Sequence, residues 1–106
     1  MNENESKITT TVCNLVHSID PDAVVILYGS YARGEAGPDS DWDILVITEK
    51  TLTWNEEQKL RELIYKYEVT SDTVLSVVIH SKKEWNNPVF QISPFYKNII
   101  REGIRL

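Results

Sequence analysis

The sequence predicts an α/β or α+β fold in which helices pack on a small mixed β-sheet. Three short apolar runs rich in β-branched residues are typical of strands, and they alternate with longer segments whose apolar residues recur at helical spacing. The chain has 106 residues, which is enough for one small core. No repeat, low-complexity tract or linker divides it, so we expect residues 1–106 to form a single domain.

The first quarter of the chain is expected to form a helix and a strand. Residues 6–19 carry apolar side chains at helical spacing, with Ser6 as a candidate N-cap and Asp20-Pro21 as a stop. Residues 23–28 form an apolar run that is too short for a helix and rich in β-branched residues. That run predicts a strand whose two faces are both covered.

The next segment is expected to hold a loop between two regular elements. Residues 30–33 can start a short helix, which the glycines and proline of residues 34–38 would end in a loop. Residues 41–47 then form a predicted second strand, which begins with the acidic residues Asp41 and Asp43.

The second half of the chain is expected to run helix, strand, helical turn and helix. Residues 53–56 have the spacing of a capping box and precede an apolar stripe, which predicts a helix. Residues 73–79 are rich in valine and form the third predicted strand, and residues 81–86 can form a turn of helix. A last helix is expected between Ser93 as N-cap and Gly103 as C-cap.

The two carboxylates at the start of the second strand are the first candidate site. Asp41 and Asp43 are two residues apart on a predicted strand, so their side chains point to the same face. Two like charges about 4 Å apart repel by about 4 kcal/mol at an effective dielectric of about 20, so this pair alone would not stabilise the fold. A bound hard cation would reverse that effect, and all-oxygen ligands favour Mg²⁺ or Mn²⁺ over zinc.

Gly29 and Ser30, directly after the first strand, are the second candidate site. A glycine there lets a phosphate approach the backbone, because no Cβ blocks it. The helix start beyond it presents free amides, and the Ser30 hydroxyl adds a donor. If the first two strands are antiparallel neighbours, this phosphate site lies beside the acid pair. Metal-dependent phosphoryl or nucleotidyl transfer requires that arrangement.

Two segments around these residues carry a known signature. They are Gly29-Ser30-Tyr31-Ala32-Arg33-Gly34 and Ser40-Asp41-Trp42-Asp43-Ile44-Leu45-Val46. Together they resemble the signature of the DNA polymerase β-like nucleotidyltransferases, and the short chain is most similar to the minimal nucleotidyltransferase (MNT) group. The resemblance implies that fold. It also implies that Gly29 and Ser30 hold the phosphates of ATP or another NTP, and that Asp41 and Asp43 bind catalytic Mg²⁺.

Arg33 and Ser40 belong to the same segments and have two interpretations each. Arg33 can steady a triphosphate, or it can pair with Glu35 or Asp39 at the surface. Ser40 is an expected nucleotide-binding residue, although a serine at such a position more often caps or orients a loop.

The resemblance also implies a third carboxylate. The family normally supplies one from a later strand, often as the general base for the acceptor hydroxyl. Asp72 is the only acid near the third predicted strand, at its start, and is the candidate for that role. If Ser76 or Val78 occupies the third position instead, the base is missing.

Composition limits the partners. With 11 Lys+Arg against 16 Asp+Glu, the net charge of −5 argues against general nucleic-acid binding. No apolar run approaches the length of a membrane span, the first residues are polar, and Cys13 is the single cysteine, so a cytoplasmic location is expected. A chain this short leaves little material for a second wall around a substrate. The acceptor would then be a partner protein, or another subunit would complete the site, as in a homo-oligomer.

The resemblance makes the partner more specific. MNT domains are often paired with a HEPN protein, as antitoxin to toxin, and similar chains attach AMP to a tyrosine of that partner. The first hypothesis is therefore an enzyme that transfers AMP from ATP to a hydroxyl of a partner protein. The alternative is a catalytically degenerate binding module that neutralises its partner by contact.

Overall fold

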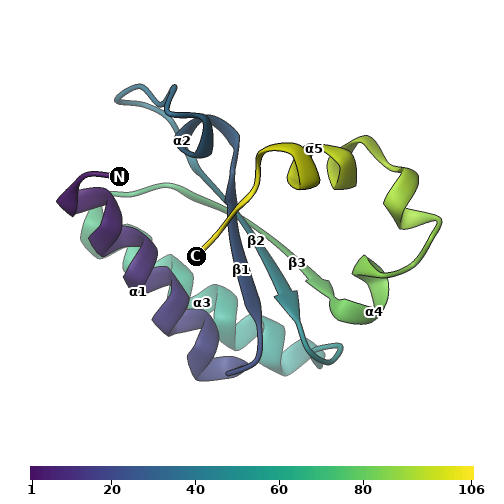
Figure 1. Ribbon diagram of the computed structural model, residues 1–106. Coiled ribbons are helices and arrows are strands. Elements are labelled where there is room, and N and C mark those ends of the chain that lie inside the picture. The colour runs from purple at the N-terminus through teal and green to yellow at the C-terminus, as the bar shows by residue number, and fades with distance from the viewer.

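The computed structural model describes residues 1–106, and its helices lie on both faces of one four-stranded sheet (Figure 1). The elements in chain order are α1 (Glu3–Ile19), β1 (Val24–Tyr28), α2 (Gly29–Arg33), β2 (Trp42–Thr48), α3 (Trp54–Ser71), β3 (Leu75–Ser81), α4 (Lys82–Trp85), the 3₁₀ turn η1 (Phe90–Ile92), α5 (Pro94–Glu102) and β4 (Ile104–Arg105). None of these helices combines the length and the apolar character that a membrane crossing needs.

The sheet has the strand order β3-β2-β1-β4 and is mixed, as predicted. Strand β1 is antiparallel to both β2 and β4, whereas β2 and β3 are parallel. The parallel pair needs a crossover, which α3 provides. Strand β4 was not predicted, because its two residues are too few to show any periodicity. Its position depends on the pairing of Leu27 with Ile104 across the sheet.

The main core lies between the sheet and the pair α1 and α3 (Figure 1). Alternate residues of β1 and β2 point into it, together with one stripe of each helix. These buried residues include Val12, Val16, Val25, Leu27, Ile44, Val46, Leu60 and Ile64. On the other face, α5 covers a smaller cluster formed by Leu45, Ile47 and Ile99. Strand β1 is therefore covered on both faces, as its sequence predicts, although its second face is only half-buried.

Most helix ends lie where the sequence places them. Thr53 caps α3 by accepting from the amide of Glu56, and Ser93 caps α5 by accepting from the amide of Tyr96. The expected N-cap of the first helix is wrong. Asn2, not Ser6, caps α1, because its side chain accepts from the amide of Glu5 and forms a capping box.

The predicted start of the third strand is also wrong. Strand β3 begins at Leu75, and Asp72 ends α3 as a C-cap with φ of 54°, in the left-handed region. The Asp72 amide donates to the carbonyl of Glu68, so the helix uses this residue to complete its last turn. The Glu68 carboxylate then accepts from the amide of Leu75 at 3.0 Å and joins the end of the helix to the strand.

Candidate functional site

The pairing of β1 with β2 brings the two sequence motifs together. The strands are antiparallel and Tyr28 lies opposite Asp43, so the end of β1 adjoins the start of β2. Gly29 follows Tyr28 directly and has φ of +75°, which L side chains rarely adopt. A Cβ at this position would collide with the Asp43 carboxylate and lie 3.0 Å from its Cγ. The sequence explains this glycine by the approach of a phosphate, and the structure adds that Asp43 occupies the space a side chain would need.

Asp41 and Asp43 lie on one face of β2, and Trp42 between them points to the other. The Trp42 side chain is buried in the main core and stacks on Tyr31, with ring centroids 3.7 Å apart and planes 8° apart. Asp43 is half-buried, whereas Asp41 is exposed. This packing of Trp42 fixes the direction of the two carboxylates on the other face.

The charges around Asp43 show which groups are its neighbours. Burial raises the pKa of Asp43 above its ordinary value, and the Asp41 charge raises it further. Arg33 lowers that pKa, whereas Glu102 raises it. Burial, and then the negative charge of Asp43, also raise the pKa of Tyr28. Burial and the neighbouring Asp41 charge thus make the ionised form of Asp43 less favourable than in water. A bound divalent cation would offset both effects, because its positive charge stabilises the two carboxylates.

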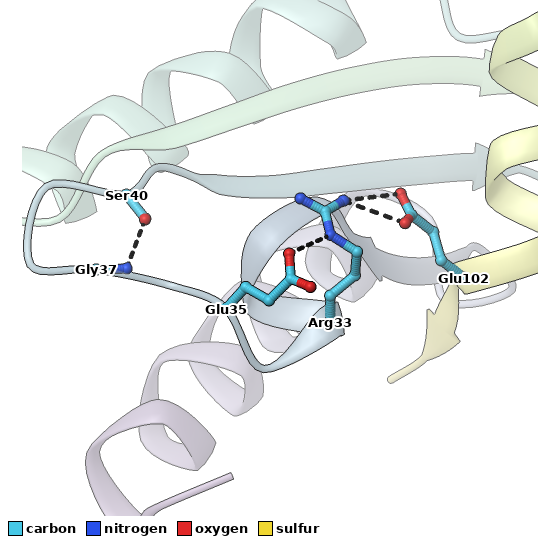
Figure 2. Close-up of polar contacts among 5 residues, drawn as sticks. All are labelled: Arg33, Glu35, Gly37, Ser40 and Glu102. Atoms are coloured by element: carbon cyan, nitrogen blue, oxygen red, sulfur yellow. Dashed lines mark hydrogen bonds and ion pairs between the residues drawn. The ribbon is translucent and has the colours of Figure 1, made fainter.

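Arg33 takes part in two ion pairs at the end of α2 (Figure 2). Its Nε donates to Glu35 at 3.0 Å, and its Nη1 donates to Glu102 at 3.1 Å. The predicted surface pair with Glu35 is therefore present, and no pair with Asp39 forms. Sequence reasoning missed Glu102, because it lies 69 positions further along the chain and no local pattern connects the two.

Ser30 and Ser40 have different surroundings. Ser30 is half-buried in the first turn of α2, the five-residue helix that follows β1. The Ser40 hydroxyl instead accepts from the amide of Gly37 at 2.9 Å and closes the loop before β2 (Figure 2). This bond supports the loop-orienting interpretation of Ser40. A direct role of Ser40 in nucleotide binding stays a prediction.

On β3, the residue beside Asp43 is Ser76 and not a carboxylate. In the parallel pairing of β2 with β3, the partner of Asp43 is Ser76, which is exposed. Asp72 caps α3 instead and lines a cavity of about 600 Å³. That cavity is also lined by Trp42, whose side chain leaves β2 on the face opposite Asp43. The sequence predicted Asp72 at the start of the third strand, and this placement is wrong because β3 begins only at Leu75.

The donor set fits a magnesium-type cation that is held partly by its substrate. No group of three acidic, histidine or cysteine side chains comes together as a metal site in this chain. Two carboxylates remain, Asp41 and Asp43, and they supply only oxygen ligands. Mg²⁺ is often bound by one or two carboxylates, with phosphate oxygens and water completing its shell.

Comparison with known proteins gives a consistent result. Residues 6–106 match the family model described as "Nucleotidyltransferase domain". A protein of Methanocaldococcus jannaschii named "Putative protein adenylyltransferase MJ0141" is 38% identical over 58 residues, which span 55% of this chain and 59% of that protein. A second, "Putative protein adenylyltransferase MJ0604" of the same organism, is 30% identical over 79 residues, which span 74% of this chain and 72% of that protein. The chain thus spans less than two thirds of the first relative.

Solved structures show the same fold. A "putative minimal nucleotidyltransferase" superposes with a TM-score of 0.66 at 28% identity and covers 98% of this chain and 94% of its own. A toxin–antitoxin structure with AMP-PNP gives a TM-score of 0.61 at 22% identity, with coverage of 99% and 72%. A Shewanella oneidensis structure of a tri-AMPylated HEPN toxin with its MNT antitoxin gives 0.52 at 20% identity, with coverage of 91% and 66%. The fold that the resemblance implies is confirmed.

Proposed function

The chain belongs to the nucleotidyltransferase domain family, and from this premise we propose that it transfers AMP from ATP to a hydroxyl of a partner protein with the help of Mg²⁺ or Mn²⁺. One observation carries the proposal. The antiparallel register of β1 and β2 sets Gly29, and Ser30 after it, against the carboxylate pair of Asp41 and Asp43. Relatives named as protein adenylyltransferases support AMP as the transferred group and a protein as the acceptor.

Each residue of the site has a defined part in this proposal. Asp41 and Asp43 hold the cation, which when bound supplies positive charge for the triphosphate and the acceptor oxygen. The backbone at Gly29 and the hydroxyl of Ser30 orient the phosphates. Arg33 adds a fixed positive charge beside Asp43.

The transfer itself replaces one bond to phosphorus by another. The acceptor oxygen forms a bond to the α-phosphorus of ATP, and the bond from that phosphorus to the bridging oxygen of the β-phosphate breaks. Pyrophosphate leaves with the electron pair. The hydroxyl proton passes to solvent, since β3 offers Ser76 and no carboxylate beside Asp43. A role of Asp72 as general base stays a prediction, and its position at the end of α3 argues against it.

The acceptor is proposed to be a HEPN-type partner. A solved neighbour is an MNT antitoxin bound to an AMPylated HEPN toxin, and a further neighbour is a toxin–antitoxin structure with AMP-PNP. At 20% and 22% identity these structures share the fold with this chain, and they support a HEPN-type protein as the partner we propose.

Ser76 favours a second candidate function. Without a third carboxylate beside Asp43, deprotonation of the acceptor is unassisted, so transfer can be slow or absent. The chain would then act as a binding module that neutralises the same partner by contact. Its nucleotide site would remain as a cation and phosphate site of low activity.

A labelling experiment separates the two functions. The protein is incubated with α-labelled ATP, Mg²⁺ and a HEPN-type protein, in parallel with an Asp41→Asn variant. Label on the partner that is lost in the variant supports the enzyme. Partner binding that survives Asp41→Asn, with no label in either reaction, supports the binding module.

A thermal shift tests the nucleotide site without any partner. A ligand at about 100 times its Kd stabilises a protein by about 2.7 kcal/mol, which raises the Tm of a domain this small by about 10 °C or more. We expect such a rise with ATP and Mg²⁺ together and little with ATP alone. If the two together give no rise, the nucleotide site is disproved.

A further inference from the structure

The end of α5 is held firmly against the start of the site. Helix α5 lies on the same face of the sheet as Asp43, and its last residue is Glu102 (Figure 1). Gly103 then passes so close to the rest of the fold that a Cβ there would lie 2.6 Å from the carbonyl oxygen of Ile99 and 2.9 Å from Cγ2 of Ile26. Strand β4 follows at once and pairs with β1. The backbone on both sides of Glu102 is therefore fixed.

Glu102 and Glu35 hold Arg33 from two sides, and they differ in exposure. Both carboxylate oxygens of Glu102 accept from Nη1 of Arg33, at 3.1 and 3.4 Å, while Glu35 accepts from Nε (Figure 2). The side chain of Glu102 is 16% exposed, against 66% for Glu35. Ion pairs between exposed side chains contribute little, and a shielded one holds its geometry better. Glu102 is thus the stronger of the two restraints.

The orientation of Arg33 is relevant to the site because Arg33 ends α2, the five-residue helix that begins with Gly29 and Ser30. Gly29 in turn lies against the Asp43 carboxylate. With Nε and Nη1 engaged by carboxylates, Nη2 keeps its hydrogen-bond donors free of protein partners (Figure 2). A planar guanidinium that is fixed at two of its nitrogens presents the third in one direction, and such a donor pair matches a phosphate oxygen.

We propose that Glu102 is a positioning residue, which orients Arg33 so that its free Nη2 donors meet the phosphates of the nucleotide. The proposal rests on the proposed nucleotidyltransferase function. The proposal predicts the direction in which the Kd of ATP changes when Glu102 is removed. If Glu102 were only a negative charge near the triphosphate, its removal would strengthen nucleotide binding. If Glu102 holds Arg33 in place, its removal weakens nucleotide binding.

The test measures the Kd of ATP with Mg²⁺ by titration calorimetry for the wild type and matched variants. We expect Glu102→Ala to raise Kd about fivefold, and Glu35→Ala, the control that removes the exposed partner, to change it less than about twofold. Glu102→Gln keeps an acceptor for Nη1 and should give an intermediate Kd. In an Arg33→Ala background, Glu102→Ala should not weaken binding further, and the loss of its negative charge should leave Kd unchanged or lower it. In a transfer assay, KM for ATP should rise with little change in kcat.

Several results would overturn the proposal. A lower Kd in Glu102→Ala identifies Glu102 as a repulsive charge only, and an equal weakening with and without Arg33 identifies a general structural role. Thermal unfolding checks that each variant folds, and if Glu102→Ala does not, Glu102→Gln takes its place in the comparison. A wild type that binds no nucleotide disproves the proposed function itself. A wild type that binds, with a Glu102→Ala variant of the same Kd, disproves this inference alone.

Discussion

At the scale of single residues, Gly29 meets two requirements that no other residue type satisfies. It needs a positive φ, and it leaves room for the Asp43 carboxylate. The sequence identified this glycine from its place after a buried strand, but it could not show that the carboxylate of another strand fills the space. A glycine of the motif can therefore have a structural reason beside the functional one.

Replacing Gly29 tests both requirements against a matched control. Gly34 also has a positive φ, of +71°, but no atom lies within 4 Å of a Cβ built there. We expect Gly34→Ala to lower the free energy of unfolding by about 1 kcal/mol, from backbone strain alone. Gly29→Ala should cost about 2 kcal/mol or more, because Asp43 must also move. Equal losses in chemical denaturation would contradict the close contact.

The raised pKa of Asp43 predicts a pH dependence of stability in metal-free protein. A carboxyl whose pKa is higher in the folded than in the unfolded state costs stability once it ionises, so stability falls as pH rises through that range. Asp43→Asn should therefore raise the Tm at pH 7, and the gain should vanish below the ordinary aspartate pKa of about 3.9. Asp39→Asn, in the exposed loop, is the control. A loss of Tm at pH 7 would refute the prediction, and Mg²⁺ should shrink the difference.

At the scale of elements, the register between β2 and β3 decides which residue lies beside Asp43. The sequence predicted the strands that contain the motif residues, but it could not state which residue of β3 pairs with Asp43. The left-handed cap at Asp72 delays β3 by two residues relative to its predicted start, and Ser76 becomes the neighbour. This delay depends on the helix end, where Glu68 links α3 to the strand through the amide of Leu75. Such contacts are not visible in the periodicity of either element.

The register can be tested by restoring the missing carboxylate. Ser76→Asp places a third acid beside Asp43, which should lower the unfolding free energy by up to about 1 kcal/mol in EDTA through repulsion of like charges. Mg²⁺ should reverse this loss and raise the Tm more than it does in the wild type. Thr10→Asp, exposed on α1, should show no Mg²⁺-dependent gain. A Ser76→Asp variant that responds to Mg²⁺ like the control would contradict the pairing.

At the scale of the whole molecule, the acidic balance is concentrated by the fold. Asp41, Asp43 and Glu102 come from two distant parts of the chain and surround a region where Arg33 is the one opposing charge among them. Part of the net charge of −5 is therefore concentrated at this end of the sheet. It gives this end of the sheet a field that favours cations, and it makes the orientation of the single arginine matter for an anionic nucleotide.

The sequence by itself determined the fold class, most helix and strand positions, and the residues of the motif, because these depend on local periodicity, on caps and on a short signature. The tertiary structure alone decided the pairing of Asp43 with Ser76, the place of Asp72 at a helix end, the two-residue strand β4 and the contact between Glu102 and Arg33. The physical reason is distance along the chain. Each of these features joins segments that share no local pattern, so only the packed sheet can bring them together.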